Sequence, residues 1–324
     1  MSGGTTFNTD FAVATADNYI SLTVKDQIFD QHGLLGWLEK KVGFDRISGG
    51  DNILIPLGIA LDSNGGSYSG YNTFDTDPSD TLGMAVYNWK AYQQPIVAQA
   101  REVLRNSSEE RKIDMWMNKV DIAMRSLRDR MNQHAFAGTV GNSGKDMQGI
   151  GLLVDSAGNV GGIDRSSATY WQANETAVSA ALAIDTSVGM LRMYNNCSTG
   201  SGDSATPDAI WTTQILYEAY ENLLAPDIRH TSRSMGDGTF SGLGFKGVPL
   251  AWDADCGSGL MYFLRSDSFS AWIHPERDFK TTEIAKADNG TLHQDAYVAH
   301  ILVWPELAIN EPRRNGKLTG ISNS

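Results

Sequence analysis

Two aspartates and a cysteine stand close together at Asp253, Asp255 and Cys256. Carboxylates and thiolates bind metal ions, and a carboxylate beside a histidine can act as a general acid or base. No histidine stands at zinc-like spacing from this group, and the later histidines are scattered, at His274, His293 and His300. A solvated turn between two strands explains the group better than a metal site does. A hydrolase or carbohydrate-active enzyme that uses Asp253 or Asp255 is the alternative.

Two glycine-rich segments invite comparison with catalytic motifs. Residues 138–146 (GTVGNSGKD) look like a phosphate-binding loop, but the spacing is wrong and Asp146 stands where Ser or Thr should bind the metal. Residues 66–70 (GSYSG) have Tyr68 where a nucleophilic serine would stand. We therefore predict no catalytic, cofactor-binding or metal-binding residues, and we expect that the protein is not an enzyme.

The most unusual segment lies between Arg46 and Lys90 and contains no basic residue. Its aspartates are Asp51, Asp62, Asp75, Asp77 and Asp80. Residues 52–61 and 81–97 have strand-like composition, each with a proline that favours an edge position, and residues 63–72 between them are rich in Gly, Ser and Asn. The pattern predicts a long acidic β-hairpin.

Such a hairpin would be nearly as long as the domain that carries it. Arms of about 10 to 18 residues at about 3.3 Å per residue extend about 30 to 60 Å. An isolated two-stranded hairpin is marginally stable in water. We therefore expect a second surface to support it, and that surface can belong to another copy of the chain.

A long amphipathic helix follows the hairpin. Ser107 and Glu110 form a capping-box pattern, and Gly138 is a C-cap candidate. One apolar stripe runs between them at spacings of three and four: Ile113, Met117, Val120, Met124, Leu127 and Met131. The second half of this helix is locally basic, with Lys119, Arg125, Arg128 and Arg130.

The rest of the chain mixes helices and strands. We predict helices over residues 174–194 and 206–224, the second with Thr206 as N-cap and Pro207 in its first turn. We predict strands over residues 247–252, 260–264, 269–273 and 297–309. Because the two kinds of element do not alternate regularly, the fold class is α+β.

Composition excludes several classes of protein. The chain has 324 residues, a net charge of −12 and two cysteines, which are too few for a disulfide framework. No basic stripe typical of a nucleic-acid reader is visible. No apolar run is long enough for a transmembrane helix, and the first residues do not resemble a signal peptide.

The order of these parts resembles a known family. A short N-terminal arm is followed by the hairpin, the long helix, a domain with two helices, and a final strand in residues 298–318 (VAHILVWPELAINEPRRNGKL). Residues 87–96 (YNWKAYQQPI) and 245–273 (FKGVPLAWDADCGSGLMYFLRSDSFSAWI) also resemble segments of that family. The chain is therefore similar, over nearly its whole length, to tailed-phage major capsid proteins of the Hong Kong ninety-seven fold.

The resemblance implies a division of the chain. Residues 1–44 would be the N-terminal arm, 45–98 the extended loop, 99–164 the peripheral domain with its spine helix, 165–295 the axial domain, and 296–324 a return to the peripheral domain. It also implies hexamers and pentamers of an icosahedral virion capsid, assembled in the host cytoplasm around double-stranded DNA that is held by non-specific contacts. A separate scaffolding protein, a portal and a decoration protein are implied partners, without a membrane. The segment between Arg46 and Lys90 lacks the lysine needed for a crosslink from its tip.

For the contact between copies we propose an electrostatic hypothesis. The loop residues Asp62, Asp75, Asp77 and Asp80 would lie near a neighbour's Lys119, Arg125, Arg128 and Arg130. Trp89 and the apolar strand residues Ile53, Ile55, Met84 and Val86 would add burial at the same contact. Exposed ion pairs contribute about 0.2 to 1 kcal/mol each and are screened by salt, so they would set register more than affinity. The alternative is that the aspartates only keep an exposed loop soluble.

Two further alternatives remain. An encapsulin-type compartment has the same fold with an enzyme cargo in place of DNA. A tail or decoration protein would form rings or trimers. Electron microscopy of the purified protein distinguishes these from a closed shell and from a small enzyme.

Overall fold

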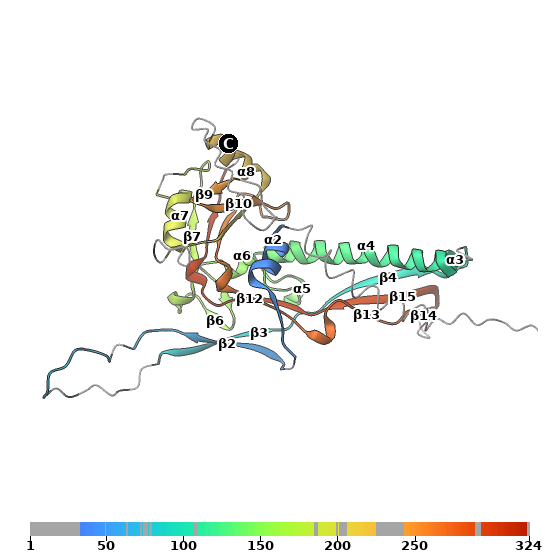
Figure 1. Ribbon diagram of the computed structural model, residues 1–324, viewed down its shortest axis with the longest axis horizontal. Coiled ribbons are helices and arrows are strands. Elements are labelled where there is room, and N and C mark those ends of the chain that lie inside the picture. The colour runs from blue at the N-terminus through green and yellow to red at the C-terminus, as the bar shows by residue number, and fades with distance from the viewer. Residues whose placement is uncertain are drawn as a thin grey trace, which may run out of the picture.

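The computed structural model describes residues 33–48, 50–62, 64–71, 73, 77, 80–105, 109–184, 187–198, 200, 206–224, 243–288 and 293–322. It confirms the predicted α+β class. A long helix lies along a narrow sheet, a second sheet stands at one end of that layer, and a β-hairpin projects from the same end (Figure 1). None of the described helices is long and apolar enough to cross a membrane.

The hairpin consists of β2 (Asn52–Gly58) and β3 (Leu82–Asn88), which pair antiparallel with each other. Its position confirms the predicted hairpin strands, but the predicted return strand over residues 81–97 is two strands. Its second half is β4 (Tyr92–Gln99), which pairs with β15 (His293–Val303) in the body of the protein. The paired part of the hairpin is therefore shorter than predicted.

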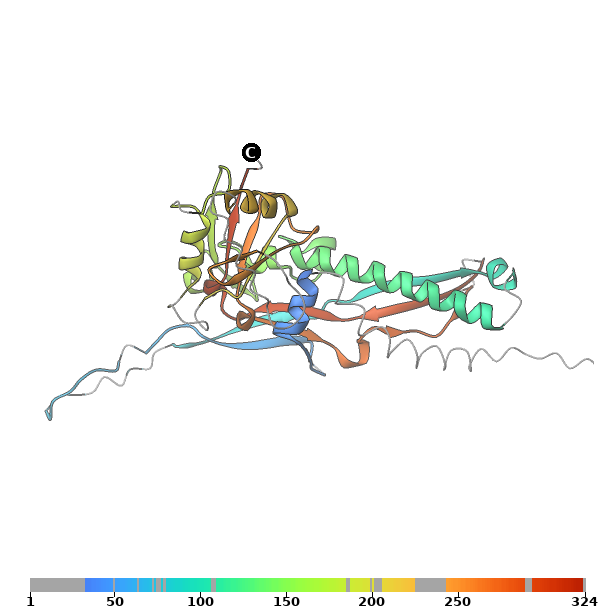
Figure 2. The same ribbon diagram turned by 45° about the horizontal axis from the view of Figure 1, so that its top comes forward.

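The predicted long helix is confirmed as α4 (Glu109–Phe136), which follows the short α3 (Ala100–Arg105). It lies over β4 and β15 (Figure 2). Its stripe is buried at Val120, Met124, Leu127 and Met131, whereas Ile113 and Met117, nearer the far end, stay exposed. The predicted cap at Ser107 lies outside the described residues. The other strands of this layer are β13 (Lys280–Thr281) and β14 (Ala285–Asp288), which pair with β15.

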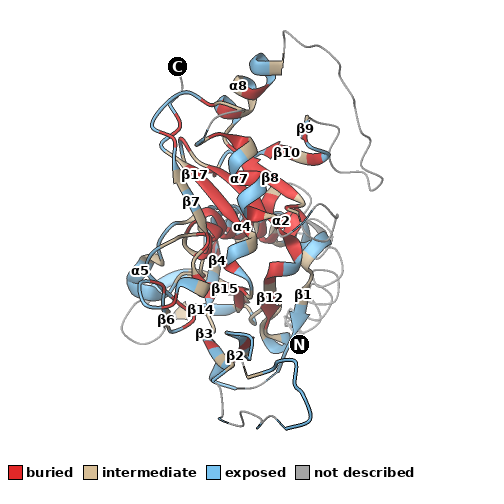
Figure 3. Cartoon of the chain, turned by 90° about the vertical axis from the view of Figure 1, so that its left-hand side faces the viewer, coloured by how far each residue is buried: buried red, intermediate tan, exposed pale blue. Residues whose placement is uncertain are grey.

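The second sheet has six strands in the order β7, β17, β11, β8, β10 and β9. Their bounds are Asn174–Ala177 for β7, Gly316–Thr319 for β17, Met261–Leu264 for β11, Ala209–Thr212 for β8, Val248–Trp252 for β10 and Gly244–Phe245 for β9. The helices α7 (Met190–Cys197) and α8 (Gln214–Leu224) belong to this layer, and it has its own hydrophobic core. Figure 3 shows buried strands at its centre and the partly exposed hairpin at the opposite end.

Both helices predicted for this layer begin later than expected. Residues 174–177 form strand β7, and of the described residues in the predicted helix over 174–194 only 190–194 are helical, as the start of α7. Ala209–Thr212, predicted to be helical, is strand β8 between β11 and β10, and all four of its residues are buried. A local helical pattern is a weak preference that sheet pairing and burial override.

A three-stranded sheet, β1, β12 and β16, connects the two layers. Its strands are Phe44–Arg46, Phe269–Ile273 and Pro305–Ile309. The predicted final strand over residues 297–309 breaks at Trp304 into β15 and β16, which join different sheets. Before β1 lie the helix α2 (Gly33–Trp37) and one turn of π-helix, Leu38–Val42.

The remaining elements are short. They are α5 (Gly141–Gly144), α6 (Ile150–Leu153), the two-stranded pair β5 (Asn159–Val160) and β6 (Ile163–Asp164), and the 3₁₀ turns Thr169–Trp171, Ser266–Ser268, Pro275–Arg277 and Pro312–Arg314. The predicted strands over residues 247–252, 260–264 and 269–273 are confirmed as β10, β11 and β12.

Candidate intersubunit surface

The two faces of the hairpin differ in burial. Alternate residues of a strand point to opposite faces. The inner face packs on the body through Ile53, Leu57, Ala85 and Tyr87, which are buried. The outer face carries Leu54, Leu82 and Met84, whose exposed fractions are 56%, 75% and 54%, together with exposed Pro56 and Val86. Ile53 was predicted to lie at an intersubunit contact, and this prediction is wrong because Ile53 is buried within its own chain.

The exposed outer side chains form one continuous apolar patch. Leu54 pairs with Val86, Pro56 with Met84, and Gly58 with Leu82, so these residues are direct cross-strand neighbours. No described residue covers them. A contiguous exposed apolar patch on a projecting element is typical of a protein–protein contact site. We call these five residues, Leu54, Pro56, Leu82, Met84 and Val86, the hairpin patch.

The predicted acidic residues lie beyond the patch. Asp62, Asp77 and Asp80 are exposed, as is Asp51 at the start of β2, whereas Asp75 lies outside the described residues. The backbone amide of Asn64 donates to a carboxylate oxygen of Asp62 at 3.0 Å. The Asn64 side-chain amide reaches across the loop to the backbone carbonyl of Asp77 at 2.5 Å. Asn64 thus connects the two arms of the hairpin, a contact that was not predicted.

The predicted basic residues of α4 have partners within their own chain. Lys119 Nζ lies 2.9 Å from a carboxylate oxygen of Glu102 and donates to the carbonyl of Val97 at 3.0 Å. Arg125 forms an ion pair at 2.7 Å with Asp121, one helical turn earlier.

Two further basic residues of α4 differ in exposure. Arg130 is exposed. Arg128 was predicted to contact a neighbouring copy, but this prediction is wrong. Only 2% of the residue is exposed, so a neighbouring copy cannot reach it. Its position on the helix, one residue after buried Leu127, carries it to the body of the protein.

Trp89 is half-buried and packs within its own chain, and its contact with a neighbouring copy stays a prediction. Its ring meets that of His274 edge to face, with centroids 5.6 Å apart, and His274 meets Trp304 in the same way at 5.5 Å. The guanidinium of Arg277 lies 5.8 Å from the Trp304 ring centre. These rings hold the point where the hairpin joins the body.

Neighbouring residues fasten the same junction, which we call the hairpin root (residues 86–92). The Val86 amide donates to the Gly161 carbonyl at 2.8 Å, and Lys90 Nζ donates to the Gly144 carbonyl at 2.6 Å. The Tyr92 oxygen accepts from the Met147 amide at 2.9 Å and lies 2.8 Å from His134 Nδ1. Burial raises the pKa of Tyr92, so its hydroxyl stays protonated and available as a donor.

Asp253 and Asp255, the candidates for enzymatic chemistry, form a structural clamp. The Asn132 side-chain amide donates to Asp253 at 3.0 Å and to Asp255 at 2.6 Å. The Leu34 backbone amide donates to Asp253 at 3.3 Å. These bonds join α4, α2 and the turn after β10. Within the described residues, no group of three or more His, Cys, Asp or Glu side chains could hold a metal ion.

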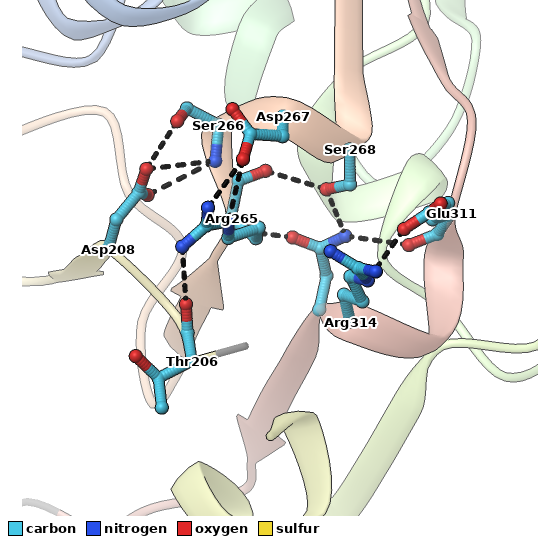
Figure 4. A network of polar contacts seen from close by, with 9 residues as sticks. Thr206, Asp208, Arg265, Ser266, Asp267, Ser268, Glu311 and Arg314 are labelled. Carbon is cyan, nitrogen blue, oxygen red and sulfur yellow. Dashed lines mark hydrogen bonds and ion pairs between the residues drawn. The ribbon is translucent and has the colours of Figure 1, made fainter. Parts of the chain in front are cut away.

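A second polar network joins the six-stranded sheet to the three-stranded one (Figure 4). Arg265, at the end of β11, bonds to Asp267 and donates to the Thr206 carbonyl at 3.0 Å. Asp208, before β8, accepts from the backbone amide and hydroxyl of Ser266.

Asn315, just before β17, completes this network. Its side chain accepts from the Arg265 amide at 2.8 Å and donates to the Ser268 hydroxyl at 2.6 Å. The two sheets are therefore joined by directional bonds as well as by apolar packing. Neither this network nor the Asp253 clamp could be read from the sequence, because their members lie far apart along the chain.

Comparison with solved structures identifies the fold. The capsid of cyanophage A-1(L) matches with a TM-score of 0.63 and 15% identity, over 88% of this chain and 92% of that chain. An encapsulin complex from Synechococcus elongatus PCC 7942 matches with a TM-score of 0.57 and 10% identity, over 89% and 88%. A structure of Mycobacterium phage Bobi matches with a TM-score of 0.55 and 12% identity, over 87% and 89%.

These identities are low, and the matches establish the fold alone. No protein-family model and no curated protein matches the sequence. The chain has the Hong Kong ninety-seven fold of tailed-phage capsid proteins, as the sequence resemblance predicted. The same fold occurs in the encapsulin, so the fold by itself does not distinguish the two kinds of shell.

Proposed function

We propose that this chain is the subunit of a closed icosahedral shell, a phage capsid of the virion. The fold supports a shell-forming role, and the hairpin patch is the observation that carries it. In a monomer, this projecting ribbon would leave five apolar side chains on its outer face in water while its inner face packs on the body. A second copy of the chain supplies the missing cover.

The expected strength of this contact suits assembly. Fully burying a Leu, Met or Val side chain contributes about 1.5 to 3 kcal/mol, and association costs several kcal/mol of lost motional freedom. One hairpin patch therefore gives a modest net affinity. Many copies of the same contact stabilise a closed shell, while each single contact stays reversible enough to correct errors during assembly.

Charge is proposed to set the register of the hairpin on its neighbour. Asp62, Asp77 and Asp80 are exposed in the loop between β2 and β3, and Arg130 is the exposed basic residue of α4 for which a neighbour's aspartate is the proposed partner. Lys119 and Arg125 already pair with Glu102 and Asp121 of their own chain, so each would have to bind a neighbour's aspartate in addition to that partner. The electrostatic contact is thus weaker than four free cations would make it.

The proposed content of the shell is double-stranded DNA. A net charge of −12 suits a container that does not bind phosphates tightly, because affinity for DNA grows with the number of cationic contacts. A separate scaffolding protein, a portal and a decoration protein are the proposed partners, with assembly in the host cytoplasm. We propose no enzymatic role, since Asp253 and Asp255 are engaged in the clamp with Asn132.

Electron microscopy of the purified protein tests the proposal. We expect closed shells from the unmodified chain, with nucleic acid inside native particles. Protein cargo without nucleic acid would favour the encapsulin-type compartment, and a monomer or small oligomer would overturn the shell.

Variants of the hairpin patch test the contact itself. L54D combined with M84D is expected to abolish shells while the chain stays folded by circular dichroism. N52D, on the same face of β2, adds a charge without removing apolar area and is the matched control, expected to assemble. Normal shells from the double variant would exclude the hairpin patch as an essential contact.

A further inference from the structure

A buried glutamate lies beneath the hairpin root. Glu306 is on β16, directly opposite Trp272 of β12, and only 1% of it is exposed. Neither carboxylate oxygen makes a hydrogen bond of good geometry to a described residue. An ionised carboxylate in such a place is strongly disfavoured. Burial therefore raises the pKa of Glu306 to about 8, and the side chain is the neutral acid at neutral pH.

The groups around this carboxyl only partly offset the effect of burial on its pKa. Lys90 and the backbone amides of Gln148 and Leu307 favour the ionised form, each by less than burial opposes it. The hydroxyls of Tyr87 and Tyr92 also lie within electrostatic range of Glu306.

More distant charges act on those tyrosines. Arg165 lies within electrostatic range of Tyr87, and Asp146 and Arg130 lie within range of Tyr92. Trp272, across the strand pair, is uncharged. Lys90 is therefore the described cation that responds most directly to ionisation of Glu306.

The residues around Glu306 are also the fastenings of the hairpin root. Tyr87 bonds to the Ile309 carbonyl, Lys90 to the Gly144 carbonyl, and Tyr92 to the Met147 amide. A negative charge on Glu306 would attract Lys90 away from Gly144 and would require water to enter beneath the two tyrosines. Ionisation therefore acts on the anchors that fix the hairpin to the body.

We propose that Glu306 is a proton-dependent switch of the hairpin root: the neutral acid keeps the root packed, and its ionisation opens the root and loosens the hairpin's contact with a neighbouring copy. The second half of this statement rests on the proposed function. The first half concerns the single chain and stands without it.

The sign of the effect follows from the two pKa values. In an opened root the carboxyl titrates near its ordinary value of 4.5, and in the closed root it titrates at about 8. Between these two pH values, closing the root takes up a proton. The ratio of closed to open molecules therefore falls about tenfold for each unit rise in pH. Below 4.5 and above about 8, Glu306 adds no further dependence.

Hydrogen exchange of the unassembled protein tests the switch. Peptides covering residues 82–99 are followed from about pH 5 to about pH 9, with rates corrected for intrinsic exchange. In the unmodified chain, opening is expected to increase with pH up to about 8 and then level off. E306Q, which cannot ionise, should remove this slope. E276Q, a change at an exposed glutamate, is the matched control and should keep it. The same slope in E306Q and the unmodified chain would overturn the proposal.

A second measurement serves if E306Q does not fold. Infrared spectroscopy of the unmodified chain should show a protonated carboxylic acid at neutral pH that disappears above about pH 8. K90M removes the favourable cation and should move this transition to higher pH. A spectrum without a protonated carboxyl at neutral pH would overturn the switch. Failure to form shells would overturn only the proposed function, because both measurements use the single chain.

Discussion

The phenolic hydroxyl of Tyr87 donates to the backbone carbonyl of Ile309 at 3.1 Å, and the Ile309 amide approaches the same oxygen at 3.4 Å. Tyr87 lies on β3 of the hairpin and Ile309 at the end of β16, so one side chain connects the projecting ribbon to the central sheet. Both groups are buried. The hairpin is therefore held at a defined angle from the body, with its apolar outer face available to a neighbour.

Removing this hydroxyl should loosen the hairpin without disturbing its packing. Y87F leaves a buried carbonyl without its donor, which costs about 1 to 3 kcal/mol. We expect a lower urea midpoint for the whole chain and faster exchange at residues 82–88. Y71F, at the fully exposed Tyr71, is the control and should leave both unchanged. Equal stability of Y87F and the unmodified chain would show that the bond does not anchor the hairpin.

The clamp at Asn132 predicts a strong effect from a change of one atom. N132D replaces the amide donor between Asp253 and Asp255 by a third carboxylate, so three like charges would share a mostly buried site. We expect a loss of about 3 kcal/mol or more in the free energy of unfolding near neutral pH. Part of this loss should be recovered in acid, where a carboxylate of the cluster takes up a proton. The measurement is urea unfolding at several pH values.

The control for this variant is the next residue of the helix. Q133E makes the same chemical change at an exposed position, where Gln133 donates to Asp129 at 3.0 Å, and should alter stability by less than about 1 kcal/mol. If N132D and Q133E were equally stable, the clamp would not contribute to the joining of α4, α2 and the turn after β10.

A glycine beside the C-terminal end of α4 tolerates no side chain. A Cβ at Gly149 would lie 2.4 Å from the His134 carbonyl oxygen and 2.5 Å from that of Ala137. Backbone atoms cannot turn aside as a flexible side chain can, so G149A should cost about 1 to 3 kcal/mol or more. G138A, at a glycine with nothing within 4 Å of its Cβ position, is the control and should be nearly neutral. The measurement is the thermal unfolding midpoint of both variants, and equal midpoints would contradict the predicted loss of stability in G149A.

The electrostatic hypothesis predicts a salt-dependent assembly. D77K combined with D80K reverses two exposed charges of the loop and should slow shell formation most at low salt, where pairing is least screened. R130Q removes the proposed basic partner of these aspartates, so the rate of shell formation by this variant should depend less on salt than that of the unmodified chain. The measurement is light scattering across a salt series. Unchanged assembly and an unchanged salt response in D77K/D80K would leave the aspartates only the role of keeping the loop soluble.

Features with a strong local pattern were predicted from the sequence. The α4 helix follows from apolar residues at spacings of three and four, and hairpin strands β2 and β3 follow from their β-forming composition around a Gly- and Ser-rich centre. The order of these parts was enough to predict the fold. Local signals of this kind depend on neighbouring residues only, and tertiary contacts reinforce them here.

Other features depend on contacts between residues far apart in the chain. Ala209–Thr212 is a strand because it lies between β11 and β10, although its own pattern favoured a helix. Arg128 is buried, while its near neighbours Arg125 and Arg130 are exposed, because one side of α4 faces the body. A list of charges along a helix does not show which of them reach solvent.

Some features of the candidate surface were likewise determined by the sequence alone, and others only by the tertiary structure. Composition and spacing alone determined that an acidic, lysine-free hairpin precedes a long helix, and that no sharp catalytic motif stands anywhere in the chain. Only the tertiary structure decided which face of the hairpin meets water, that Trp89 braces its own root, and that Glu306 is buried beneath it. Burial and pairing are properties of the assembled sheets, because each depends on strands that are brought together from distant parts of the sequence.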